Sequence, residues 1–295
     1  MSAAFPVSVI FPAKDESETI GVLVARVREL LPSAEVIVVD DGSGDDTKGV
    51  AEKAGARVLR HPSSRGNGAA VKTGVRNARG EVLVLLDADG QHDPADIARL
   101  LAEIDAGFDL VVGARNAGAQ ASIGRLLANG FYNRLAGWMV GQRVDDLTSG
   151  FRAVRADKMR EFVHLFPNGF SYPATSTMAF FRAGYGVRYV PLAVGQRLGT
   201  RKSHIRLFRD GFRFFLIIFR VATLYSPLKI FTPISAGLFL GAIGYASWTL
   251  LQTGRFTLFS ALLFMTSMLT FLIGLVSEQI TQLLYARQNN VSGQE

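Results

Sequence analysis

The residues best suited to chemistry follow a short apolar run at 82–86. Asp87 and Asp89 come directly after this run, and Gln91 lies two residues further on. Carboxylate and amide oxygens are the hard ligands that Mg²⁺ or Mn²⁺ takes, usually in a site shared with substrate phosphates. An ordinary strand-to-helix turn is the alternative interpretation of the pair. Asp93 precedes a proline and is typical of a helix N-cap.

Short apolar strands that alternate with helical patterns are expected to position these side chains. The predicted strands are 7–11, 35–40, 56–60, 82–87 and 110–113, and the predicted helices are 19–31, 47–54, 68–77 and 94–106. Such alternation predicts an α/β, Rossmann-like domain with a mostly parallel sheet and helices on both faces. Further along, 123–140 and 158–166 read as helices and 187–190 as a strand.

Polar residues and glycines follow four of the strands. They occupy 12–16, 40–47, 61–70 and 87–91. Because the carboxyl ends of parallel strands meet at one edge of a sheet, these segments should converge on a ligand site, and carboxylates with glycines suit a nucleotide. Neither a GxGxxG fingerprint nor a Walker A loop follows the first strand. Asp41 is interpreted as a ligand-binding residue, and Asp45 and Asp46 as helix caps.

The C-terminal part is predicted to enter a membrane. Residues 230–251 and 256–277 each run for 22 residues without a charge, about 33 Å as helix against a hydrocarbon core of about 30 Å. Two buried helices of a soluble bundle are the alternative.

The absence of cysteine excludes disulfides and thiolate chemistry.

Residues 197–229 carry the whole net charge of +7. Arginines and phenylalanines at helical spacing between 205 and 220 predict an amphipathic helix at the membrane surface. Nucleic-acid binding is the rival interpretation, and it is disfavoured because the helix runs directly into the hairpin. The two uncharged runs predict an integral membrane protein, and the positive charge that flanks them predicts that its catalytic part and both termini are cytoplasmic.

An ordered set of motifs carries a family resemblance. The motifs are Pro12 to Glu16, Val38 to Ser43, Gly66 to Gly74, Asp87 to Asp89 and Asp146 to Arg152. In this order they resemble glycosyltransferase family 2, and within it the dolichyl-phosphate mannose synthase-like polyprenyl-phosphate glycosyltransferases. The resemblance covers nearly the whole chain, including the two-span hairpin of the bacterial members.

The resemblance implies a GT-A fold that binds a UDP- or GDP-sugar. It implies a metal set for Mg²⁺ or Mn²⁺, nucleotide-binding positions, and arginines that hold a lipid phosphate. These are Asp87, Asp89 and Gln91 for the metal; Pro12, Glu16, Asp41 and Gly68 for the nucleotide; and Arg115 and Arg125 for the phosphate. Members of the family often have a lid over the diphosphate, and the segment from Arg197 to Ser203 matches it. Arg197 and Lys202 are the cations expected at the diphosphate, and Arg201 stands where the family has serine.

A lipid phosphate is already an anion, so it can attack the anomeric carbon without a general base. Asp89, Arg115 and Arg125 are then the expected catalytic residues, through charge stabilisation and in-line positioning. A single displacement inverts the anomeric centre. The expected acceptor is undecaprenyl or dolichyl phosphate in membrane lipid, and the chain is also compatible with a homo-oligomer.

The expected organisation is a catalytic domain at 1–200, an interface helix region at 201–227, a transmembrane hairpin at 228–287 and a cytoplasmic tail at 288–295. A processive polysaccharide synthase is one alternative, although neither tryptophan follows an arginine as in the usual motif of those enzymes. A catalytically inactive membrane scaffold that binds nucleotide is the other.

Overall fold

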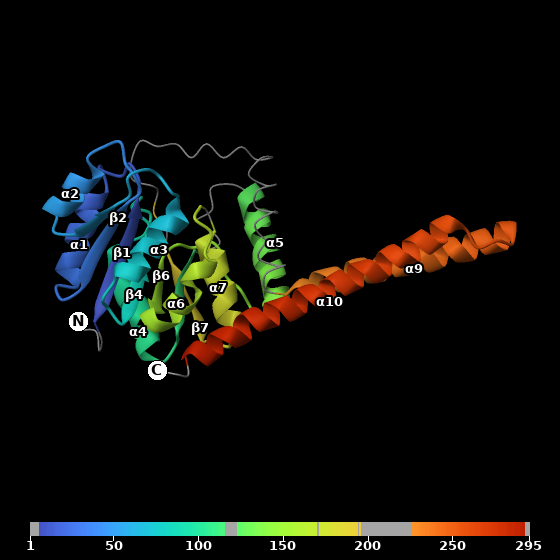
Figure 1. The fold of residues 1–295 in the computed structure, drawn as a ribbon. Coiled ribbons are helices and arrows are strands. Elements are labelled where there is room, and N and C mark those ends of the chain that lie inside the picture. Colours follow the sequence, from blue (N-terminus) through green and yellow to red (C-terminus); the bar gives the residue numbers. More distant parts are fainter. Residues whose placement is uncertain (1–5, 116–122, 170, 194, 196–225, 293–295) are drawn as a thin grey trace. The chain divides into compact units, whose positions relative to one another are not determined.

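The structure is a computed structural model that describes residues 6–115, 123–169, 171–193, 195 and 226–292 (Figure 1). The chain divides into two compact units, Met1–Arg206 and Leu207–Glu295. The predicted amphipathic helix and the segment from Arg197 to Lys202 lie outside the described residues.

The first unit is built on a seven-stranded sheet with the order β3-β2-β1-β4-β6-β5-β7. The strands are β1 Val7–Ala13, β2 Glu35–Asp40, β3 Arg57–Arg60, β4 Val82–Leu85, β5 Leu110–Arg115, β6 Arg152–Arg155 and β7 Val187–Leu192. All neighbours pair in parallel except β6, which runs antiparallel to both β4 and β5. The predicted α/β sheet is therefore confirmed as a mixed one, with one central strand that the apolar pattern did not indicate.

Helices cover both faces of this sheet. They are α1 Ile20–Leu30, α2 Thr47–Lys53, α3 Asn67–Asn77, α4 Ile97–Asp105, α5 Ile123–Val140, α6 Ala156–Phe162 and α7 Tyr172–Arg182, with 3₁₀ turns at Pro94–Asp96 and Val163–Leu165. Residues of α1 and α4 share one core with the inward side chains of β1, β2 and β4. On the other face α3 lies close to the sheet, because Gly74 leaves no side chain between its helix and Ile10.

The second unit is a hairpin of two apolar helices that run side by side, α9 Pro227–Thr253 and α10 Leu258–Ser292 (Figure 1). Both are long and apolar enough to cross a membrane, with mean hydropathy of 1.5 for Pro227–Thr253 and 2.1 for Leu258–Leu283. The two predicted spans are thus present as helices, and α10 continues well beyond residue 277.

Small and hydroxyl side chains form the seam between α9 and α10. Every seventh residue is buried there: Ser235, Ala242 and Thr249 on α9, and Ser260, Ser267, Gly274 and Thr281 on α10. A seven-residue repeat keeps one stripe of each helix facing its partner, and small residues let the backbones approach closely. Ser267 Oγ donates to the carbonyl oxygen of Ser235 at 2.9 Å, which ties the two helices together across the seam.

Candidate functional site

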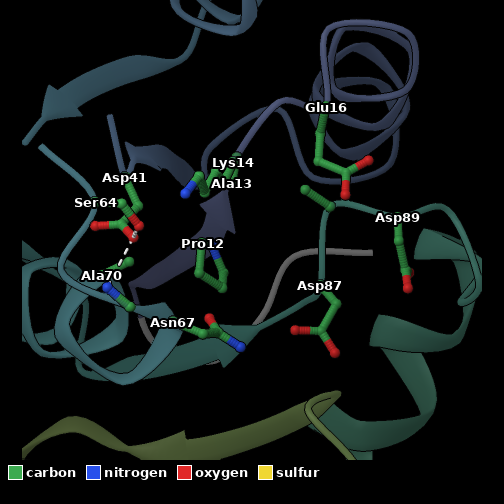
Figure 2. A pocket seen from close by; sticks show the side chains of 12 residues that line it. Pro12, Ala13, Lys14, Glu16, Asp41, Ser64, Asn67, Ala70, Asp87 and Asp89 are labelled. Carbon is green, nitrogen blue, oxygen red and sulfur yellow. Dashed lines mark hydrogen bonds between the residues drawn. The ribbon is translucent and has the colours of Figure 1, made fainter. Parts of the chain in front are cut away.

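A cavity of about 400 Å³ opens at the carboxyl ends of β1, β2 and β4. Its lining combines carboxylates, a lysine and small residues: Pro12, Ala13, Lys14, Glu16, Asp41, Ser64, Gly66, Asn67, Ala70, Asp87, Ala88 and Asp89 (Figure 2). The structure thus brings together five residues selected from the sequence, namely Pro12, Glu16, Asp41, Asp87 and Asp89. The volume and the mixture of charges suit a polar ligand of nucleotide size.

Asp87 and Asp89 lie just beyond the end of β4. Figure 2 shows both carboxylates extending to the same side of the loop that carries them. Asp89 Oδ1 also accepts the backbone N–H of Gln91 at 3.1 Å. The Gln91 carbonyl accepts the N–H of Gly195 at 2.9 Å, and Gln91 is not among the residues that line the cavity.

The donor set fits a divalent cation that shares its site with phosphates. Within the part of the chain that the structure describes, no three His, Cys, Asp or Glu side chains gather into a metal site of their own. Asp87 and Asp89 therefore offer two hard oxygen donors beside an open cavity. Mg²⁺ and Mn²⁺ are commonly bound in this way, by one or two carboxylates with substrate phosphates and water as the remaining ligands.

Asp93 caps the following helical turn, as the sequence indicated. Its Oδ1 accepts the backbone N–H of Ala95 at 2.9 Å, and Pro94 occupies the first helical position. This hydrogen bond fixes the residue at which the helical turn begins.

The carboxylate of Asp41 organises the loop after β3. Oδ1 accepts from His61 Nδ1 at 2.7 Å and from the N–H of Arg65 at 2.8 Å, and Oδ2 accepts from Ser64 Oγ and from the N–H of Gly66, each at 2.8 Å. Burial alone would raise the pKa of Asp41, but these hydrogen bonds outweigh burial and hold the pKa below its ordinary value. Asp41 thus shapes the cavity wall as well as lining it.

The depressed pKa of Asp41 predicts a loss of stability in acid. Since its folded-state pKa lies below the unfolded value of about 3.9, its contribution is complete above about pH 4 and disappears as the pH falls through the folded value. The free energy of unfolding, measured in urea between about pH 3 and pH 6, should therefore fall more steeply at the acid end for the wild type than for Asp41→Asn. If the free energy of unfolding falls equally with pH in both proteins, protonation of Asp41 does not contribute to the loss of stability in acid.

The segment that carries Glu16 is held by hydrogen bonds that its backbone donates to the loop after β2. The backbone N–H groups of Asp15, Glu16 and Ser17 donate to the side chains of Ser43, Thr47 and Asp45, at 2.9, 2.9 and 3.1 Å respectively. Asp15 adopts a φ of 53°, which few residues other than glycine tolerate, and its Oδ1 accepts the N–H of Gly44 at 2.6 Å. Asp45 also accepts the N–H of Thr47 at 3.1 Å, whereas Asp46, the N-cap residue of α2, makes no capping hydrogen bond with its side chain. Of the two predicted caps, only Asp45 therefore bonds to the start of the helix.

The glycine-rich start of α3 is packed against a distant loop. The N–H of Gly68 donates to the carbonyl of Gly169 at 2.9 Å, and a Cβ at Gly68 would overlap the carbonyl oxygen of Pro167. Gly68 itself does not line the cavity, whereas Gly66 and Asn67 do. The structure therefore gives Gly68 a packing reason, and its predicted contact with a nucleotide stays a prediction.

Arg115 forms a mostly buried ion pair with Asp146. Its Nε donates to Asp146 Oδ2 at 2.8 Å and one terminal nitrogen donates to Oδ1 at 3.0 Å, while the same nitrogen also contacts Thr148 Oγ1. The Arg115 side chain keeps 30% of its surface exposed, against 8% for Asp146. Burial works to raise the pKa of Asp146, but Arg115 and the neighbouring N–H groups hold it below its ordinary value.

Three predicted cations cannot be placed against the cavity. Arg125 lies on the first part of α5, where the structure describes the backbone and not the side chain. Arg197 and Lys202 fall outside the described residues altogether. Their roles toward the lipid phosphate and the diphosphate stay predictions.

Comparison with known proteins decides the family. The model of "Glycosyl transferase family 2" matches residues 8–162, which is more than half of the chain. The chain belongs to glycosyltransferase family 2. Within this family-2 protein, residues 226–283 match a second model, the "GtrB C-terminal hairpin".

Curated relatives of this family-2 chain include several named for lipid-linked sugars. Polyprenol monophosphomannose synthase of Mycolicibacterium smegmatis is 32% identical over 67% of this chain and 82% of its own length. Undecaprenyl-phosphate mannosyltransferase of Micrococcus luteus is 33% identical over 66% and 86%. Glycosyltransferase AglJ of Haloferax volcanii is 30% identical over 82% and 77%.

A solved structure supports the GT-A fold of the family-2 chain. Glucosyl-3-phosphoglycerate synthase from Mycobacterium tuberculosis, crystallised with Mn²⁺ and UDP-glucose, superposes with a TM-score of 0.61 at 23% identity over 75% of this chain and 80% of that one. At this level of identity the likeness concerns the fold alone.

Asp146 and Arg152 are the site-forming residues that sequence reasoning did not single out. Both lie in the segment from Asp146 to Arg152, which carried the family resemblance without an assigned role. The signal available was two charged residues that bracket a Ser-Gly pair in an otherwise uncharged segment.

Proposed function

We propose that this chain transfers a hexose from UDP or GDP to a polyprenyl phosphate, with inversion, at the cytoplasmic face of a membrane. The observation that carries the proposal is the union, in one chain, of a cavity lined by Asp87 and Asp89 with a hairpin of two membrane-type helices. This acceptor class is supported by the names of three relatives: a polyprenol monophosphomannose synthase, an undecaprenyl-phosphate mannosyltransferase and a dolichyl-phosphate hexose transferase.

The donor nucleotide occupies the cavity in this proposal. Pro12, Glu16 and Asp41 lie around the nucleoside, and Asp87 and Asp89, with Gln91 beside them, hold Mg²⁺ or Mn²⁺ at the diphosphate. Mn²⁺ and UDP-glucose in the superposable synthase support both ligands. When bound, the divalent cation would stabilise the negative charge of the departing nucleoside diphosphate. Arg197 or Lys202 is assigned a second positive charge for the same diphosphate.

The acceptor phosphate needs positioning rather than deprotonation. A phosphate oxygen forms a bond to the anomeric carbon while the bond from that carbon to the diphosphate oxygen breaks on the opposite side, and so the configuration inverts. Arg115, oriented by Asp146, and Arg125, on α5, are the cations assigned to the phosphate. Holding the two reactants in line removes much of the entropic part of the barrier.

The membrane part delivers this chemistry to the lipid. Helices α9 and α10 span the bilayer, the basic segment before them lies on its cytoplasmic surface, and both termini stay on that side. The proposed boundaries are those expected from the sequence, with 1–200 catalytic, 201–227 interfacial, 228–287 spanning and 288–295 a tail. A homo-oligomer is compatible with this arrangement.

A donor panel tests the function directly. Membranes that contain the protein are incubated with Mg²⁺ or Mn²⁺, polyprenyl phosphate and, in turn, UDP- and GDP-linked hexoses, and the lipid product is identified by mass. One added hexose per lipid phosphate is the expected result. A polymeric product would favour a processive synthase, and nucleotide binding without turnover on any donor would favour an inactive scaffold.

Replacing Arg125 by alanine is expected to weaken the acceptor more than the donor, because a cation assigned to the lipid phosphate does not reach the nucleoside. The loss in apparent affinity for polyprenyl phosphate should be about tenfold or more, in line with one charged hydrogen bond of about 1.5–3 kcal/mol. Arg134→Ala, at an exposed position of the same helix, is the matched control. An equal effect of Arg125→Ala on both substrates would place Arg125 away from the acceptor.

A further inference from the structure

Arg152 is a fully buried cation in the middle of the sheet. It begins β6 and pairs with Leu85 of β4 on one side and with Val112 of β5 on the other. Its two terminal nitrogens donate to carbonyl and hydroxyl oxygens, whereas its Nε has no hydrogen-bond partner among the described residues. Burial of a charged group without an ion-pair partner is costly, so packing alone does not explain an arginine at this position.

The guanidinium of Arg152 ties two segments together. One terminal nitrogen donates to the carbonyl of Pro173 at 3.1 Å and to the hydroxyls of Ser176 and Thr177 at 2.7 and 3.3 Å, all on α7. The other terminal nitrogen donates to the carbonyl of Ser149. Arg152 therefore clamps the turn before β6 onto helix α7.

Tyr172 forms a hydrogen bond with the same turn, at the carbonyl of Gly150. Its hydroxyl donates to the carbonyl of Gly150 at 3.2 Å, and its ring lies under the Arg152 guanidinium with 5.7 Å from Cζ to the ring centroid. From the other side Asp146 Oδ1 accepts the N–H groups of Thr148 and Ser149 at 3.0 and 3.1 Å. The turn from Asp146 to Gly150 is thus fixed at both its carbonyl and its N–H groups.

This turn forms the wall against the Asp87 carboxylate. A Cβ added at Gly150 would lie 2.8 Å from Asp87 Cγ and 2.9 Å from Oδ1. Only glycine therefore lets the backbone come so close, and any displacement of the turn changes the room that the Asp87 carboxylate has. Arg152 acts on Asp87 from a distance, through Ser149 and Gly150.

We propose that Arg152, together with Tyr172, is a positioning residue that sets the Asp87 carboxylate for the divalent cation by locking the Ser149–Gly150 turn. This inference rests on the metal site of the proposed function. A rival account assigns Arg152 a purely electrostatic effect. The two differ in sign, because a positive charge near Asp87 repels a cation, whereas a correctly placed carboxylate attracts it.

Mn²⁺ affinity distinguishes the two accounts. The full-length protein in detergent, with saturating UDP or GDP, is titrated with Mn²⁺, and the free ion is followed by electron paramagnetic resonance. We expect Arg152→Met to weaken Mn²⁺ by about tenfold or more, the range found when groups that orient metal ligands are removed. Arg152→Lys should recover only part of the affinity, since one ammonium cannot reach both Ser149 and α7.

Tyr172→Phe keeps the charge and the packing and removes only the hydrogen bond to Gly150. It should weaken Mn²⁺ by about threefold with little change in thermal stability, as expected for one neutral hydrogen bond, and it keeps the test valid if Arg152→Met does not fold. Arg155→Met is the matched control, because Arg155 lies on the same strand but donates to Ile104 on the opposite face at 3.3 Å.

The outcomes separate the two levels of the proposal. Wild-type protein that binds no Mn²⁺ at all overturns the metal site and this inference with it. Wild-type binding together with unchanged affinity in Tyr172→Phe and unchanged or tighter affinity in Arg152→Met overturns the positioning role alone and leaves the metal site standing. A loss of Mn²⁺ affinity that is larger in Arg152→Met than in Tyr172→Phe, with the affinity of Arg155→Met unchanged, supports the positioning role of Arg152 and Tyr172.

Discussion

Asp89→Asn should lower metal-dependent transfer by at least ~100-fold, or ~2.7 kcal/mol of transition-state stabilisation. The substitution keeps the size of the side chain and its ability to accept the N–H of Gln91, but it removes a negative charge from the cavity that Asp89 lines. With only two carboxylates in the metal set, the loss of one charge removes a large share of the attraction for the cation. The measurement is turnover with Mg²⁺ and with Mn²⁺ at saturating donor and acceptor.

Asp93→Ala is the control for Asp89→Asn. It removes the side chain that accepts the N–H of Ala95 at the start of the next helical turn, which should cost about 1 kcal/mol of stability. Activity per folded molecule should remain, because Asp93 does not line the cavity. Turnover of Asp89→Asn close to that of the wild type would remove the metal assignment, whereas loss of activity in Asp93→Ala would show that the loop geometry is the more sensitive feature.

The regular alternation of the first strands made most of the sheet predictable. β4 is a continuous apolar run and β1 is apolar apart from Ser8, as expected of strands that are buried on both faces. Strand β6 could not be predicted from an apolar run. It has four residues, begins with the buried Arg152 and runs antiparallel between β4 and β5, so its place in the sheet depends on tertiary hydrogen bonds and not on local hydrophobicity.

Helix α7 escaped prediction for a related reason. All residues from Tyr172 to Phe180 are buried, hydroxyls included, so it presents no polar stripe of the kind that marks a surface helix. Its Ser176 and Thr177 hydroxyls instead accept from Arg152. A helix that serves as a polar partner for a buried cation shows no amphipathic period in its sequence.

The residues of the candidate site were likewise predictable where strand topology places them, and not where only a tertiary contact does. Residues at the ends of parallel strands, such as Asp41 and Asp89, could be expected at one rim because topology alone brings strand ends together. Gly150 could not be connected with Asp87 beforehand, since the contact exists only once β6 is inserted next to β4. Likewise, the sequence showed Arg115 as a cation for phosphate but not its ion pair with Asp146.

Asp146→Ala should destabilise the first unit strongly. It removes the carboxylate that pairs with Arg115 and that also accepts the N–H groups of Thr148 and Ser149. Breaking a buried pair by deleting one partner costs about 3–5 kcal/mol, and the partial exposure of Arg115 argues for about 3 kcal/mol, the lower end of that range. Denaturant unfolding of the full chain in detergent measures the change.

The opposite truncation, Arg115→Ala, should cost less than Asp146→Ala. The carboxylate it leaves behind still accepts from Thr148 and Ser149, whereas the guanidinium left by Asp146→Ala keeps only Thr148 Oγ1 among the partners described here. The double variant should cost less than the two single changes together, because neither charge is then left without its partner. If the two losses are equal and add, the two side chains act independently, and the ion pair contributes no coupling energy.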